Sequence, residues 1–91
     1  MNIREAQDFS NKVVDVLIKE RQKQGLSRYK ISKLCGVSEA ALSYIENHER
    51  HPTLYTLKQI ATVLNVNLYK LIKEIEENAN KLYSVFMSYK Y

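Results

Sequence analysis

The sequence predicts an all-α protein, a compact bundle of five helices in which the fifth helix extends toward the C-terminus. Three observations lead to this prediction. The 91 residues include only two glycines and one proline, so there is little turn material. The stretches between them are rich in Leu, Ile, Lys, Glu and Ala, which favour helices. Apolar residues recur along several of these stretches at helical spacing.

Apolar spacing places the first helix before Gly25. We expect it to begin between Arg4 and Ser10 and to end near Gln24, because glycine favours helix termination. Two short helices are expected next, at about residues 28–35 and 39–47. The residues of the first helix that recur at helical spacing are Phe9, Val13, Val14, Leu17 and Ile18.

Two further helices are predicted after the polar loop HERHP. Thr53 can cap the fourth helix, and Asn67 can cap the fifth. Asn65 suits a left-handed C-cap between them, with Val66 in the core. The fifth helix begins at Leu68 and meets no helix breaker before the C-terminus. The predicted inward stripe of the fourth helix is Leu54, Leu57, Ile60, Ala61 and Leu64.

Residues 27–47 carry the most informative pattern, SRYKISKLCGVSEAALSYIEN. Ser27 and Ser38 can each cap a short helix, and Gly36 lies where the chain must turn sharply. The apolar positions of this stretch are Ile31, Leu34, Cys35, Val37, Leu42 and Ile45. This pattern is typical of a helix-turn-helix, whose second helix enters the major groove of DNA.

The charge distribution agrees with a DNA-binding protein. Lys and Arg number 14 against 10 Asp and Glu, a net charge of +4. Residues 19–51 hold seven of the basic residues and four of the acidic ones, so most of the excess surrounds the predicted motif. This is the electrostatic pattern of a phosphate-binding face, although a basic soluble surface also fits it.

The chain has one cysteine, no apolar run that could span a bilayer and no apolar signal core near its start. A cytoplasmic protein with no membrane partner is therefore expected.

The sequence resembles the Cro and lambda-repressor-like, or XRE, helix-turn-helix family. The matching stretches are RQKQGLS, ISKLCGVSEAALSYIEN, HPTLYTLKQIATVLNV and NLYKL. The resemblance implies a five-helix DNA-binding domain at residues 1–75, with the motif at 27–47 and the recognition helix at about 38–47. It also implies a transcriptional regulator, mostly a repressor or activator of bacteria, phages or plasmids, that binds a palindromic operator as a two-fold dimer.

The resemblance also implies which residues touch double-stranded DNA. The predicted base-reading residues are Ser38, Glu39, Ala40, Ser43 and Tyr44. Glutamate can accept from a cytosine amino group and alanine can contact a thymine methyl, although a carboxylate in the first helical turn also stabilises the helix dipole. Tyr44 suits a sugar or phosphate contact as well as a base contact. The predicted phosphate contacts are Arg28, Lys30, Asn47 and Arg50.

Three positions depart from the family pattern. Arg28 replaces the usual glutamine, which favours a phosphate contact over a base contact. Ser32 stands where a smaller residue is usual, and it still fits. His48 replaces the usual glycine, which allows a different turn in the loop after the recognition helix. By the same resemblance, Arg21 and Glu46 form a partly buried ion pair that fixes the recognition helix.

No enzyme, cofactor or metal site is predicted. His48 and His51 flank Glu49, but no cysteine pair or third ligand accompanies them, and a loop histidine near DNA phosphate is the better interpretation. The sequence contains no Ser-His-Asp arrangement, P-loop or paired carboxylate site.

The C-terminal extension, residues 76–91, is expected to be helical. Leu68, Ile75, Leu82 and Tyr89 are spaced seven apart, a short heptad-like pattern. We expect homodimerisation through Leu82, Val85, Phe86 and Tyr89. Two alternatives remain at this point. The extension could fold back on the first helix, or the protein could be an antitoxin or adaptor whose C-terminal helix binds a partner protein.

Overall fold

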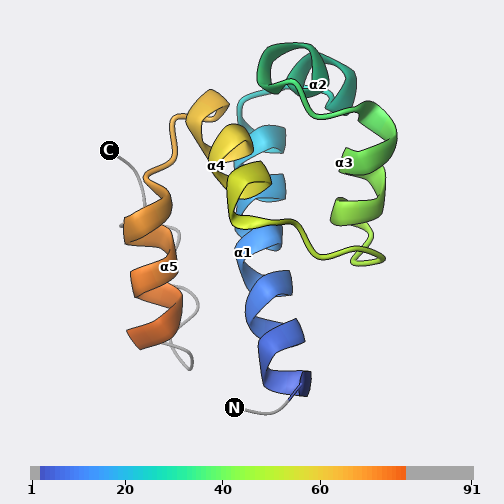
Figure 1. Cartoon of the computed structure of the whole chain (residues 1–91). Coiled ribbons are helices and arrows are strands. Elements are labelled where there is room, and N and C mark those ends of the chain that lie inside the picture. Colours follow the sequence, from blue (N-terminus) through green and yellow to red (C-terminus); the bar gives the residue numbers. More distant parts are fainter. Residues whose placement is uncertain (1–2, 78–91) are drawn as a thin grey trace.

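The computed structural model describes residues 3–77, which form five helices in the predicted order (Figure 1). The all-α fold class is confirmed for this part of the chain. The residues predicted to form a dimer interface lie outside the described part of the chain: Leu82, Val85, Phe86 and Tyr89. The helices are α1 (Ile3–Lys23), α2 (Arg28–Cys35), α3 (Glu39–Glu46), α4 (Leu54–Val63) and α5 (Leu68–Glu77).

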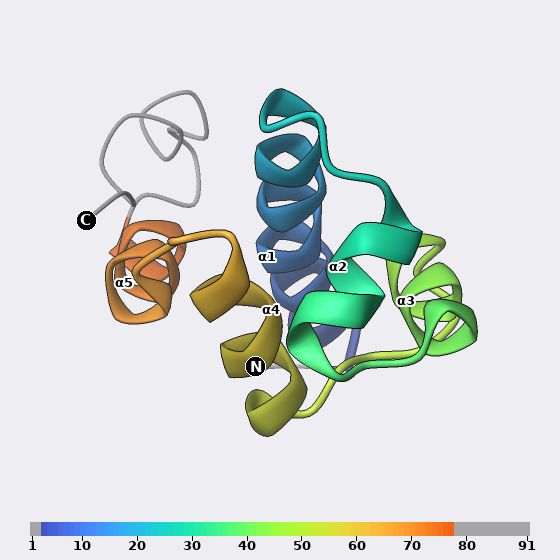
Figure 2. The ribbon, with the colours of Figure 1, turned by 90° about the horizontal axis from the view of Figure 1, so that it is seen from above.

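The helices are arranged around α1, which lies between the helix-turn-helix and α5 (Figures 1 and 2). On one side α1 packs against α3, and on the other side it packs against α5, which runs antiparallel to it. The fourth helix packs against both α2 and α5. As a result, α3 and α5 occupy opposite sides of the molecule.

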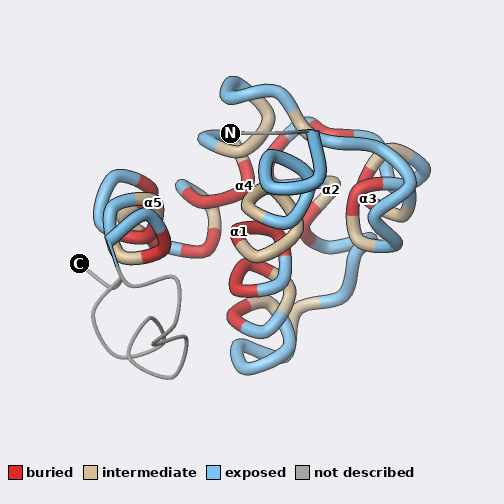
Figure 3. Tube along the Cα trace, turned by 90° about the horizontal axis from the view of Figure 1, so that it is seen from below, coloured by how far each residue is buried: buried red, intermediate tan, exposed pale blue. Residues whose placement is uncertain are grey.

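The core is formed by the faces that these helices turn toward one another (Figure 3). Ala61, Val66 and Leu71 are completely buried, and Val13, Ile31 and Leu64 nearly so. They come from α1, α2, α4, α5 and the turn before α5. Leu42 of α3 belongs to the same cluster, so one core joins all five helices. None of the described helices has the length and apolar character needed to cross a membrane.

The helix ends follow the predicted caps. Ser27, Ser38 and Thr53 each accept a hydrogen bond from the backbone N–H three residues later, at 3.0 to 3.1 Å. Asn67 does the same for α5, accepting from the N–H of Lys70 at 3.1 Å. Gly36 and Asn65 are left-handed, with φ of 79° and 59°. The predicted helix punctuation is therefore confirmed.

Three details of the prediction were wrong. The first helix begins at Ile3, before the predicted window, because nothing in residues 3–9 interrupts a helix. Leu34 is 54% exposed, since α2 fills its inward face with Ile31 and Cys35. Leu54 is 70% exposed because it is the first residue of α4, and the helix reaches the core one turn later at Leu57.

Candidate nucleic-acid interface

The third helix is placed by its inner face and by the turn before it. Leu42 and Ile45 are buried, at 2% and 5% exposure. Gly36 ends α2 in the left-handed conformation that glycine adopts without strain. The side-chain amide of Gln59, on α4, donates to the carbonyl of Cys35 at 3.2 Å and so satisfies an orphan acceptor at the end of α2. The end of α2 is thereby held against α4.

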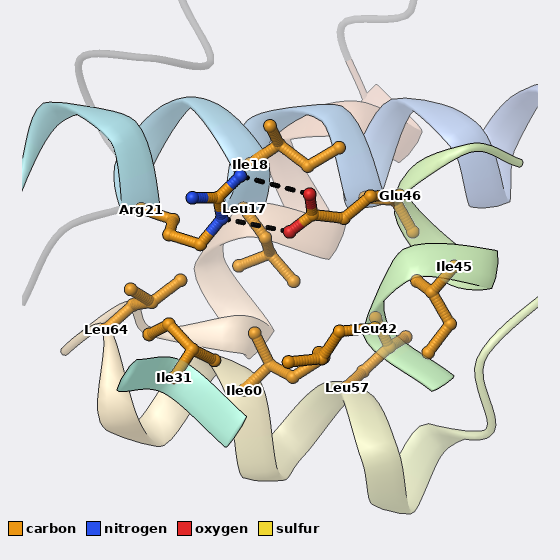
Figure 4. Close-up of a pocket in the computed structure, with 11 residues that line it drawn as sticks. Leu17, Ile18, Arg21, Ile31, Leu42, Ile45, Glu46, Leu57, Ile60 and Leu64 are labelled. Atoms are coloured by element: carbon orange, nitrogen blue, oxygen red, sulfur yellow. Dashed lines mark hydrogen bonds and ion pairs between the residues drawn. The ribbon is translucent and has the colours of Figure 1, made fainter. Parts of the chain in front are cut away.

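An ion pair attaches α3 to α1 (Figure 4). Arg21 Nε and Nη2 donate to the two carboxylate oxygens of Glu46 at 2.9 and 3.0 Å. A third donor, Nη1, reaches the carbonyl of Leu26 at 2.7 Å, in the segment that leads into α2. Both ionic side chains are only 14% exposed, so this bidentate pair is shielded from water. Together with the contact to Leu26, it joins α1, α3 and the segment before α2.

Arg28 approaches the same carboxylate, a contact that the sequence does not suggest. Its Nε lies 4.0 Å from Glu46 Oε1, and its side chain stays 43% exposed. The positive charge at the start of α2 is therefore oriented by Glu46 while its guanidinium remains accessible to an anion.

The outer face of α3 is accessible along its length. Ser38, Glu39 and Ala40 are exposed, Ser43 is half-buried and Tyr44 is 45% exposed. An open hollow connects this face with the start of α2, and it is lined by Ser27, Arg28, Tyr29, Glu39, Ala40 and Ser43. The structure thus brings the Arg28 side chain next to three of the predicted base-reading residues.

The other predicted phosphate residues are exposed in the elements next to α3 in the chain. Lys30 is exposed in the first turn of α2, and Asn47 and Arg50 are exposed in the segment after α3. The guanidinium carbon of Arg50 lies 4.9 Å from the centre of the Tyr44 ring. This stacking contact was missed at the sequence level, where Arg50 and Tyr44 were assigned separate roles.

The loop after α3 is fastened to α1 by its two histidines. His48 has φ of 62°, so it takes the left-handed turn that the family's usual glycine would take. Its Nε2 lies 2.8 Å from Asp15 Oδ1, and His51 Nδ1 lies 3.0 Å from Ser10 Oγ. Both rings therefore contact α1, and a position near DNA phosphate stays a prediction.

The apolar cavity between α1, α3 and α4 offers little room for a small ligand. The cavity beside the Arg21–Glu46 pair (Figure 4) has a volume of about 20 Å³ and is lined mainly by apolar side chains. Ligand pockets are usually larger than about 300 Å³. Within residues 3–77, no group of three or more His, Cys, Asp or Glu side chains is placed to hold a metal ion.

The fold and the exposed face of α3 define a helix-turn-helix domain, and comparison with known proteins agrees. The helix-turn-helix family model matches residues 17–71. The chain belongs to this family, in its XRE type, a class of DNA-binding transcriptional regulators.

A relative and the solved structures complete the comparison. The chain is 48% identical over 46 residues to the HTH-type transcriptional regulator SutR of Escherichia coli (strain K12). The match covers 50% of this chain and 26% of SutR, so the chain spans only about a quarter of that relative. No solved structure matches significantly.

Proposed function

We propose that this protein is a sequence-specific transcriptional regulator, acting as a repressor that occupies a palindromic operator as a homodimer. The observation that carries the proposal is the contrast within α3. Its inner face is locked to α1 by the Arg21–Glu46 pair, and its outer face is open and continuous with the exposed Arg28. A helix held in this way can enter the major groove without rearrangement of the domain.

Base recognition in this proposal comes from the outer side chains of α3. Glu39 accepts from a cytosine amino group, and Ala40 contacts a thymine methyl. Ser43 and Tyr44, one turn further along, reach the next base pairs or the sugar edge. None of these is an arginine or glutamine that reads one base strongly, so part of the specificity comes from DNA shape.

Affinity comes mainly from the phosphates. Arg28 at the start of α2 lies where a phosphate alongside the groove would be contacted, and Lys30, Asn47 and Arg50 add further contacts. Counterion release at these positions gives binding a steep dependence on salt.

Dimerisation through the C-terminal residues Leu82, Val85, Phe86 and Tyr89 remains part of the proposal. The described end of α5 lies on the side of α1 that faces away from α3 (Figure 1), which supports it. An interface built from that end leaves the outer face of α3 free for DNA. A two-fold dimer then predicts half-sites about 10 bp apart, one helical turn.

The proposal is tested by selecting random duplexes on the purified protein at low and moderate salt. We expect an inverted repeat. Arg28→Ala is expected to weaken binding roughly tenfold on all duplexes and to reduce the salt slope by about 0.9, the value for one phosphate. Tyr44→Ala is expected to alter the recovered motif instead.

Lys70→Ala is the matched control, because it removes the same charge from α5, away from α3. It should leave both the motif and the salt slope nearly unchanged. Recovery of no motif, with only weak and salt-sensitive binding, would reject a sequence-specific regulator and favour an adaptor that binds a partner protein.

A further inference from the structure

We infer that Arg50 is a positioning residue for Tyr44, so that the two side chains act as one recognition unit. The inference rests on the proposed function and deepens it. It assigns to a loop residue, outside the recognition helix, an influence on which base pairs the protein prefers.

The backbone brings the two residues together. After α3 ends, the chain folds back, and the N–H groups of Glu49 and Arg50 both donate to the carbonyl of Tyr44, at 2.9 and 3.2 Å. Arg50 is thus attached to the peptide unit of the residue whose ring it covers. The contact between the side chains follows from this local fold and does not depend on two long side chains meeting by chance.

The two side chains are also in contact. The guanidinium carbon of Arg50 lies 4.9 Å from the ring centre of Tyr44, within the range of a cation–π contact. One face of the ring is covered by the guanidinium, while 45% of the residue stays exposed. An aromatic side chain held in one orientation loses less conformational entropy on binding than a free one.

The loop that presents Arg50 is fixed on both sides. His48 contacts Asp15 at 2.8 Å and His51 contacts Ser10 at 3.0 Å, so the residues that flank Arg50 are attached to α1. The same α1 holds α3 through the Arg21–Glu46 pair. The loop that carries Arg50 and the helix that carries Tyr44 are therefore both attached to α1. These attachments keep the two side chains in contact in the absence of DNA.

Stacking leaves the donors of Arg50 available. Arg50 is exposed and its guanidinium carries five N–H donors, so donors remain to bind a phosphate. A phosphate contact made by Arg50 would then set the position of the Tyr44 ring relative to the DNA backbone. In this way a sequence-independent contact influences base preference.

The test is a double-mutant cycle on the duplex recovered by the selection and on copies with single base-pair changes. The variants are Arg50→Ala, Tyr44→Ala, the double variant and Arg50→Lys. We expect Arg50→Ala to relax preference at the same base pairs as Tyr44→Ala. We also expect the double variant to show the same base preference as Tyr44→Ala, with a further loss of affinity that is equal on all duplexes because the Arg50 phosphate contact is gone. Arg50→Lys should restore the salt slope but not the full preference, because lysine is a point charge without a planar face.

A matched control is available on α2, where the Lys33 ammonium lies 5.2 Å from the centre of the Tyr29 ring. Lys33→Ala removes a stacked positive charge from a tyrosine outside α3, and it should leave base preference unchanged. Thermal melting of each variant confirms that the fold is intact.

Two results would overturn the inference. If Arg50→Ala weakens all duplexes by the same factor, and the effects of the two single variants multiply in the double variant, then Arg50 is a phosphate contact alone. If the selection recovers no motif at all, the proposed function fails and this inference fails with it. The first result leaves the proposed function standing, so the two failures are distinguishable.

Discussion

The two faces of α3 differ in how firmly the rest of the molecule holds them. On the inner face, Leu42 and Ile45 are buried and Glu46 makes a bidentate pair with Arg21. On the outer face, Glu39 and Ala40 are exposed, and the contact that restrains Tyr44 comes from a neighbouring loop. The position of the helix is thus decided by the interior, while the side chains that meet DNA can change without altering the fold.

Breaking the Arg21–Glu46 ion pair on the inner face should have the largest effect on stability. Glu46→Ala leaves the Arg21 guanidinium at 14% exposure without its carboxylate, and it also removes the charge that Arg28 approaches. Loss of one partner of a shielded ion pair costs about 3 kcal/mol in the free energy of unfolding. Urea unfolding followed by circular dichroism measures this.

Glu49→Ala is the control for that change, since it removes an exposed carboxylate three residues later and should cost less than about 0.5 kcal/mol. Equal losses in the two variants would contradict the assignment of the Arg21–Glu46 pair as the attachment of α3.

A substitution in the turn between the two motif helices should have an intermediate effect on stability. Gly36 has φ of 79°, and a Cβ there would meet the Gln59 amide nitrogen at 3.8 Å, an ordinary contact. Gly36→Ala should therefore cost only the backbone strain of a left-handed residue, about 1.5 kcal/mol by thermal unfolding. Gly25→Ala is the matched control, with φ of 70° and nothing within 4 Å of the added Cβ. A much larger loss at Gly36 than at Gly25 would show that packing against α4, and not strain, limits this turn.

The sequence could predict the features that depend on neighbouring residues. The caps at Ser27, Ser38, Thr53 and Asn67 follow from residue type and position, and each is present. A hydroxyl or amide oxygen three residues before a free N–H has one favourable partner, so the local pattern determines the contact. The Arg21–Glu46 pair spans 25 residues, and it could be placed only through the resemblance to a known family.

The features that the sequence missed join distant segments. His48–Asp15, His51–Ser10 and Gln59–Cys35 connect residues 24 to 41 apart, where nothing local identifies the partner. Buried Glu20 was also missed: Gln24 donates to its carboxylate at 2.8 Å and to the carbonyl of Leu64 at 2.8 Å. A carboxylate in a helix is predicted to lie at the surface unless a buried hydrogen-bond partner for it is known, and here that partner is the Gln24 amide.

In the candidate DNA-binding face, too, the sequence predicts what depends on local spacing and misses what depends on distant contacts. The exposed positions of α3 follow from helical spacing once Leu42 and Ile45 are placed inside. The Arg50–Tyr44 stack depends instead on the fold of the loop, in which the left-handed His48 turns the chain back toward α3. That conformation is uncommon for residues other than glycine, so the sequence alone favoured a different turn.

Changing the outer face should have the smallest effect on stability and a distinct effect on binding. Glu39 is in the first turn of α3, where its carboxylate interacts favourably with the helix dipole, and it lines the hollow that Arg28 shares. Glu39→Gln should lower the free energy of unfolding by about 0.5 kcal/mol. It should also raise affinity for all duplexes, because a negative charge next to phosphates is removed. Preference at one base pair should move from cytosine toward adenine, since glutamine pairs with the adenine edge.

Glu49→Gln is the control that separates the general electrostatic effect of Glu39→Gln from its effect on base preference. It removes an exposed carboxylate from the loop after α3, so it should raise affinity by a similar factor while the preferred bases stay the same. The comparison is made by titrating both variants against the recovered duplex and its cytosine-to-adenine copy. If the two variants behave alike on both duplexes, Glu39 serves the helix dipole and reads no base. A shift confined to Glu39→Gln would place base recognition in the first turn of α3, on a residue that the interior of the molecule does not constrain.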